Sequence, residues 1–76
     1  MNDLNDRDKL VLKMVHRRFS IREMARDLDV GMGTIQDSLE KLERGGFVMN
    51  PPGRLARMRS LTQKGDELLR REGLLK

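Results

Sequence analysis

Basic side chains without acidic neighbours occupy one segment of the chain, from residue 44 to residue 64. Its cations are Arg44, Arg54, Arg57, Arg59 and Lys64, and the segment contains no aspartate or glutamate. Guanidinium and ammonium groups bind phosphate oxygens through charge-assisted hydrogen bonds, and no carboxylate of this segment competes for them. The segment is therefore suited to binding phosphate groups. The alternative is a solvated hairpin edge whose charges discourage aggregation.

Other kinds of chemistry find little support in the sequence. His16 is the single histidine and cysteine is absent, so a zinc site is not expected, and neither is any other cofactor. Gly31-Met-Gly33 has no preceding strand and no following Gly-Lys-Ser/Thr, which a nucleotide-binding loop would need. No nucleophile–base pair, carboxylate dyad or small-molecule pocket stands out. We therefore expect that the protein is not an enzyme.

Length and charge limit the possible architectures. The 76 residues suffice for one small domain, expected over residues 1–76. The net charge is +4 and the pI about 10.1, a mild basic excess. The polar, acidic N-terminus is unlike a secretory signal, and no apolar run approaches the roughly 20 residues of a membrane span. A cytoplasmic protein without a membrane partner is expected.

Three helices are expected before the basic segment, over residues 6–17, 21–28 and 32–44. Asn5 can cap the first, and Ser20 with Glu23 forms a capping box for the second. The third begins after a turn and has either Gly31 or Thr34 as its N-cap. The positions expected to be buried are Leu10, Val11, Met14 and Val15, then Ile21, Met24, Ala25 and Leu28, then Ile35, Leu39 and Leu42.

A β-hairpin over residues 47–61 and a last helix over residues 63–72 are expected to follow. Gly45 and Gly46 end the third helix, because glycine readily adopts the left-handed conformation found there. Pro52-Gly53 suits the centre of a type II turn, and Thr62 can cap the last helix. The fold class is therefore mainly α with a small β-hairpin.

Two stretches resemble winged helix-turn-helix regulators. Residues 21–48, with Ile21-Arg-Glu-Met-Ala25 and Leu42-Glu-Arg-Gly-Gly-Phe-Val48, resemble the DNA-binding domain of GntR-type proteins. Residues 61–69, Leu-Thr-Gln-Lys-Gly-Asp-Glu-Leu-Leu, are similar to the end of the MarR-type and PadR-type domain. The resemblance implies three helices, a two-stranded wing and a C-terminal helix.

The resemblance also implies positions that contact DNA. Arg22 lies near the start of the second helix, and Met32, Thr34 and Gln36 match the part of the third helix that enters the major groove. Arg54 and Arg57 match the wing that contacts the backbone or minor groove, and Arg59 follows in the same acid-free segment. A small DNA-binding transcriptional regulator, acting as a repressor in a prokaryotic or viral, nucleoid-associated setting, is the expected function.

The expected recognition helix departs from the family pattern. Gly31-Met32 stands where the family has Ser or Thr and then Arg, and Gln36 where it often has Arg. The exposed positions also carry the acids Asp37, Glu40 and Glu43. Gln36 remains suited to an adenine edge, and a carboxylate can accept a hydrogen bond from a cytosine amino group. A module that binds protein through this acidic helix is the alternative.

Leucines near the C-terminus suggest a homodimer. Leu68, Leu69, Leu74 and Leu75 exceed what one face of a short helix needs for packing, and Leu4 and Leu12 could join them. A symmetric dimer would place two recognition helices about one helical turn apart on a pseudo-palindromic operator. The alternative is that Leu68 and Leu69 cover the first helix.

Overall fold

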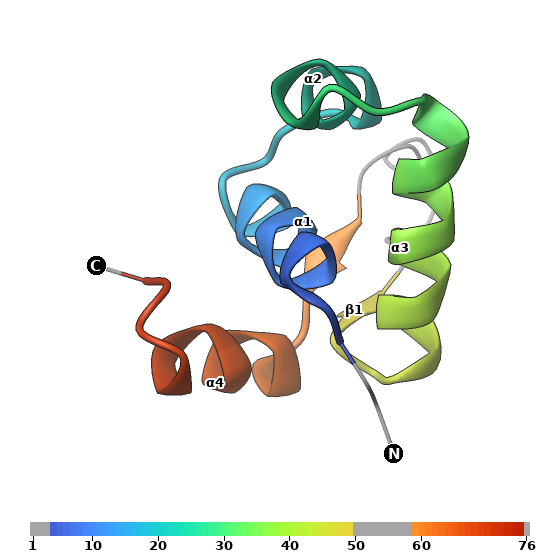
Figure 1. The fold of residues 1–76 in the computed structure, drawn as a ribbon. Helices are drawn as coiled ribbons and strands as arrows, with labels where there is room; N and C mark the ends of the chain where they lie inside the picture. The colour runs from blue at the N-terminus through green and yellow to red at the C-terminus, as the bar shows by residue number, and fades with distance from the viewer. Residues whose placement is uncertain (1–3, 50–58, 76) are drawn as a thin grey trace.

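The fold is mainly helical and carries one small antiparallel sheet, as the sequence indicates. The computed structural model describes residues 4–49 and 59–75. Its elements are α1 (Asp6–His16), α2 (Ile21–Leu28), α3 (Met32–Arg44), β1 (Val48–Met49), β2 (Ser60–Leu61) and α4 (Gln63–Arg71) (Figure 1). The expected bounds of α2 and α3 are confirmed, whereas α1 and α4 each end one residue earlier than expected.

Side-chain caps determine where three of the helices begin. The Asn5 side chain accepts a hydrogen bond from the Asp8 N–H at 2.8 Å, and Asp8 accepts one in return from the Asn5 N–H at 3.1 Å. Ser20 and Glu23 form the expected capping box at α2. Thr62 caps α4 by accepting from the Gly65 N–H. The N-cap of α3 is Gly31, which leaves that helix without a side-chain cap.

The turns between the helices use left-handed backbone conformations. Asp29 ends α2 with a φ of 55°, and the following Val30 packs against the core. Gly46 has a φ of 81° just after α3, so the Gly45-Gly46 stop is confirmed. Arg18, with a φ of 63°, turns the chain between α1 and α2. The turn at Asp29 brings α3 back onto α2, and the turn at Gly46 brings β1 back onto α3.

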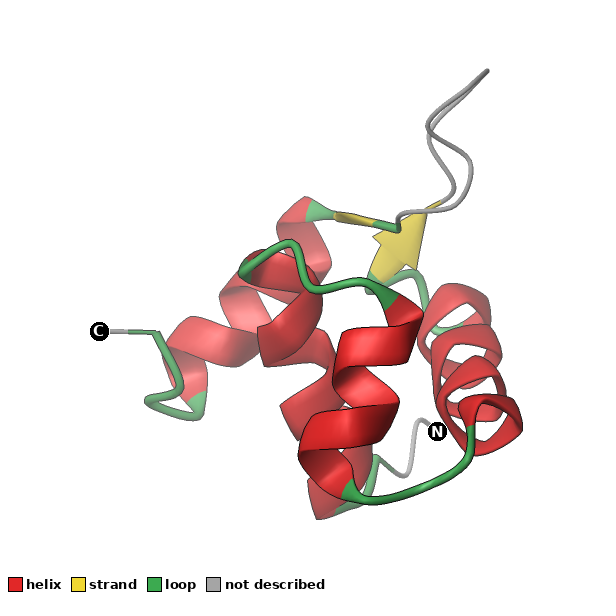
Figure 2. Cartoon of the chain, turned by 90° about the horizontal axis from the view of Figure 1, so that it is seen from above, coloured by secondary structure: helices red, strands yellow, loops and turns green. Residues whose placement is uncertain are grey.

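The two strands connect the helical body to α4. Val48 pairs with Leu61 and Met49 with Ser60 in antiparallel register, at one edge of the helices (Figure 2). The Thr62 N–H donates to the Phe47 carbonyl at 3.1 Å, and its hydroxyl donates to the Gly46 carbonyl at 2.6 Å. The start of α4 is thereby fastened to the end of α3. The expected turn at Pro52-Gly53 lies outside the described residues.

The core forms where α1 meets its neighbours. Figure 1 shows α1 in the middle, with α2, α3 and α4 around it, and α1 also contacts β2. The buried apolar side chains are Val11, Leu12, Val15, Met24, Ala25, Ile35, Leu39, Leu42, Phe47, Val48 and Leu69. Within the described residues, no helix combines the length and the apolar character needed to cross a membrane.

The buried stripe of α1 differs from the prediction. Leu10 is 40% exposed and Met14 is half-buried, whereas Leu12 is fully buried. The observed stripe is Asp8, Val11, Leu12 and Val15, which follows the i, i+3, i+4, i+7 spacing of one helix face. Because the stripe includes an aspartate, a prediction from the apolar residues alone shifted the buried face of α1 by one residue.

Candidate nucleic-acid interface

Helix α3 presents a long polar surface. Its buried residues Ile35, Ser38, Leu39 and Leu42 share one face, which packs against α1 and α2, and β1 lies near its end. The opposite face, including Gln36, Asp37 and Glu40, is exposed. A helix held by one face in this way can insert the other face into the groove of a duplex.

Gln36 and Arg59 are brought to the same hollow, although they are distant in sequence. This hollow of about 440 Å³ lies between the start of α2, the outer side of α3 and the residue preceding β2. Its lining residues are Ser20, Ile21, Gln36, Glu40 and Arg59. Gln36 is exposed and Arg59 is half-buried. An amide, a carboxylate and a guanidinium therefore face one small region, which offers hydrogen-bond donors and acceptors together.

Thr34 lies on the other side of α3. It is half-buried and lines a separate hollow with Asn5, Arg7, Asp8, Asp37, Ser38 and Lys41. Residues two apart in a helix are rotated by about 200° around its axis, so they point to nearly opposite sides, and Thr34 and Gln36 do not share a face. The structure therefore does not place all the predicted contacts of α3 together.

An ion pair beside Thr34 fixes α3 against α1. The Lys41 ammonium lies 2.8 Å from the Asp8 carboxylate, whose side chain is only 3% exposed. Burial raises the pKa of Asp8, but hydrogen bonds from Lys41, the Asn5 N–H and Ser38, together with the Lys41 charge, outweigh it. The net pKa of Asp8 lies below its ordinary value. The sequence did not predict that Asp8 would be buried.

Arg22 and Met32 are the other two helical residues that were predicted to contact DNA. Arg22 is exposed in the first turn of α2, and Met32 is 48% exposed at the first residue of α3. Glu23 is held by the Ser20 cap, and the hydrogen bond from the Ser20 N–H lowers the pKa of Glu23. Arg22 is thus available at the surface beside a fixed helix start.

The basic segment divides into different roles. The Lys64 ammonium donates to the Gly45 carbonyl at 2.6 Å and lies 4.8 Å from the centre of the Phe47 ring. Lys64 thereby satisfies a backbone carbonyl at the C-terminal end of α3, where a positive charge also interacts favourably with the helix dipole. Arg44 lies 3.9 Å from Glu40, one turn earlier on α3. Arg54 and Arg57 lie outside the described residues.

Two of the three acids expected at the surface of α3 are exposed, whereas Glu43 is half-buried. Asp37 and Glu40 are exposed, and Lys41 is directed to Asp8. The contact between Glu40 and Arg44, at 3.9 Å, is too long for a hydrogen bond. The exposed surface of α3 is therefore less suited to phosphate than the arginines beside it. The hollow with Glu40 was missed from the sequence, although the i, i+4 spacing of Gln36 and Glu40 signals a shared face.

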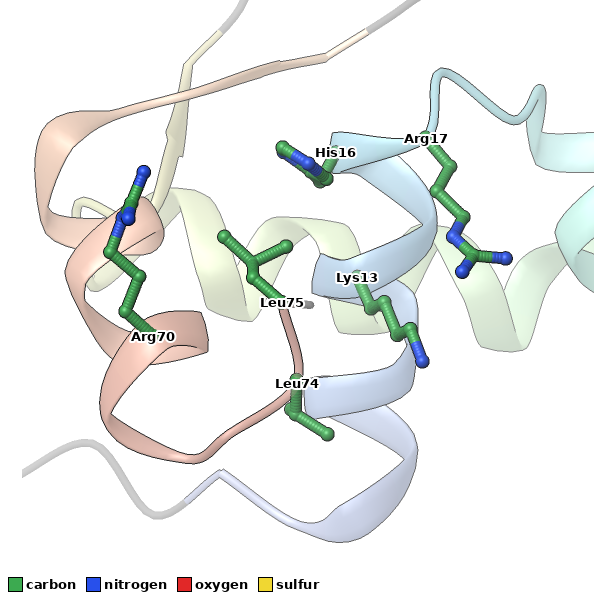
Figure 3. Close-up of a pocket in the computed structure, with 6 residues that line it drawn as sticks. All are labelled: Lys13, His16, Arg17, Arg70, Leu74 and Leu75. Carbon is green, nitrogen blue, oxygen red and sulfur yellow. The ribbon is translucent and has the colours of Figure 1, made fainter.

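The candidate dimer residues fall into two groups. Leu69 and Leu12 are fully buried in the core, so they cannot form an exposed contact surface, which corrects that part of the prediction. Leu68, Leu74 and Leu75 are half-buried. Leu74 and Leu75 line a hollow of about 440 Å³ whose other lining residues are Lys13, His16, Arg17 and Arg70 (Figure 3).

Comparisons with other proteins return nothing similar: no family model, no curated protein and no solved structure matches this chain.

Proposed function

We propose that the chain is a winged helix-turn-helix protein that binds duplex DNA and regulates transcription, acting as a repressor. In this proposal α3 enters the major groove, and the strand pair β1–β2 forms the base of the wing. Support comes from one observation above all: Gln36 of α3 and Arg59, which precedes β2, line the same hollow. The order of the helices and strands and the exposed Arg22 agree with this arrangement.

The chemistry of the exposed side chains on and beside α3 supports the same proposal. The amide of Gln36 can donate to and accept from an adenine edge, whereas Arg22 and Arg59 are suited to phosphate oxygens. Met32, exposed at the start of α3, is suited to apolar contact with a thymine methyl group. Arg54 and Arg57 are proposed to extend the contact along the backbone.

Replacement of Gln36 by alanine tests the proposal. We expect binding to a duplex with the preferred site to weaken by about 1–3 kcal/mol, and discrimination at one A·T pair to be lost. Binding to random duplex should change little. Fluorescence anisotropy at low salt, with wild type and variant on both duplexes, measures these effects. No binding by the wild type to any duplex would contradict the proposal.

A protein-binding module is the second candidate function, favoured by the exposed acids Asp37 and Glu40. A partner with a basic surface would be the natural ligand of such a face. This candidate predicts no association with random duplex at low salt, whereas a DNA-binding protein with basic residues associates detectably. The anisotropy measurement therefore separates the two.

We further propose that two copies associate through Leu68, Leu74 and Leu75. Replacement of both Leu74 and Leu75 by serine should shift sedimentation towards the monomer and make the melting temperature independent of protein concentration. A two-fold contact there would also bring the cations Lys13 and Arg17 of both copies together, so added salt should strengthen it. A wild-type chain that sediments as a monomer across the micromolar range would contradict the dimer.

A further inference from the structure

We propose that Glu40 is a specificity-determining residue, which accepts a hydrogen bond from the amino group of a cytosine in the major groove. It would read this base beside an adenine that is read by Gln36. The inference rests on the proposed DNA-binding function and deepens it. It assigns a role to an exposed acid of α3 that would repel phosphate.

The geometry places the two side chains side by side. Gln36 and Glu40 are four residues apart on α3, so they lie one above the other on one face. Both line the hollow that Arg59 and the start of α2 complete. A ligand that enters this hollow therefore meets the amide and the carboxylate together.

The carboxylate selects which part of a duplex this hollow can accept. An ionised carboxylate is an acceptor only, and phosphate oxygens are also acceptors, so Glu40 repels the backbone. In the major groove, the donors are the amino groups of cytosine and adenine, whereas guanine and thymine offer acceptors. The hollow therefore suits base edges, and Glu40 disfavours guanine and thymine at the position that it faces.

Gln36 and Glu40 would then each recognise a different base. The amide offers both a donor and an acceptor, which matches the N7 and amino group of adenine, whereas the carboxylate matches the cytosine amino group. Four residues of helix separate the two side chains by about 6 Å along the axis, and base pairs are stacked about 3.4 Å apart. The preferred site should therefore carry an adenine and a cytosine one or two base steps apart.

The structure gives Glu40 no strong structural role within the described residues. Its side chain is 57% exposed, and within the described residues its ion-pair contact is the 3.9 Å approach to Arg44. An exposed pair at this distance contributes little to folding. Replacement of Glu40 by glutamine should therefore leave the fold intact, which circular dichroism can verify before DNA binding is measured.

Selection of binding sites from a random duplex pool tests the inference, with wild type, Glu40→Gln and Glu67→Gln compared. Glu67 is an exposed glutamate of α4, so its variant makes the same chemical change on another helix. Wild type should enrich sites with a fixed C·G pair close to an A·T pair. The preference of Glu40→Gln for the C·G pair should be about tenfold weaker than that of wild type, and its other base preferences should be unchanged. Glu67→Gln should retain every preference.

Two results would overturn the inference, and they differ from each other. If Glu40→Gln binds all duplexes more tightly but keeps the base preferences of the wild type, Glu40 is only a repulsive charge and the DNA-binding function stands. If the wild type itself enriches no sequence and binds no duplex, the proposed function fails together with the inference.

Discussion

Replacement of Gly65 by alanine is expected to destabilise the fold by about 3 kcal/mol. Gly65 is buried in the first turn of α4, where that turn crosses the chain just before β1. A Cβ atom at this position would overlap the Phe47 carbonyl oxygen and crowd the Leu61 side chain. Because the obstacle is backbone, α4 would have to move away. That movement would strain the hydrogen bonds from Thr62 to Gly46 and Phe47.

Gly33→Ala is the matched control for this prediction. Gly33 lies in α3, and a Cβ atom built there meets no atom within 4 Å. Alanine has the higher helix propensity, so this variant should be more stable than wild type by up to about 1 kcal/mol. Urea unfolding followed by circular dichroism measures both changes. Equal stability of Gly65→Ala and wild type would show that α4 does not approach β1 this closely.

The second large effect is expected at Asp8. Replacement by asparagine keeps the shape of the side chain but removes the charge that pairs with Lys41 at 2.8 Å. We expect a loss of about 2 kcal/mol in the free energy of unfolding, below the range for fully buried pairs because Lys41 is 44% exposed. Asp37→Asn, an exposed acid of α3, is the control and should change stability by less than about 0.5 kcal/mol.

The same ion pair predicts how stability depends on pH. The folded pKa of Asp8 is lowered, so its contribution is fully present above the unfolded pKa and is lost as the pH falls through the folded pKa. Wild type should therefore lose stability when the pH falls below about 4, the ordinary aspartate value. Over this acid range the stability of Asp8→Asn should fall less steeply. Parallel pH profiles for the two proteins would contradict the role assigned to Asp8.

Local signals in the sequence were sufficient to predict the helices. The caps at Asn5, Ser20 and Thr62 begin three helices as expected, and Gly46 marks the end of α3. These features depend on hydrogen bonds between residues close in sequence. The buried stripe of α1 was less predictable, because Asp8 is made compatible with burial by Lys41, a residue 33 positions later.

The candidate interface was also only partly predictable from the sequence, because it combines residues that are distant along the chain. The helical spacing of α3 indicated which side chains are exposed, and Gln36 and Met32 are exposed as expected. Sequence could not indicate that Arg59 reaches the same hollow as Gln36, because that depends on how β2 packs. Nor could it separate the cations by role: Lys64 closes the end of α3, although it belongs to the acid-free segment.

The most direct test of the proposed function is to map which residues contact a duplex. Nuclear magnetic resonance spectra of isotope-labelled protein, recorded while a duplex with the selected site is added, report this residue by residue. Large shifts are expected at Arg22, Gln36 and Arg59, with few changes along the side of α4 that faces solvent. Spectra that do not change, or shifts confined to α1 and α4, would contradict the claim that α3 and the adjoining hollow bind DNA.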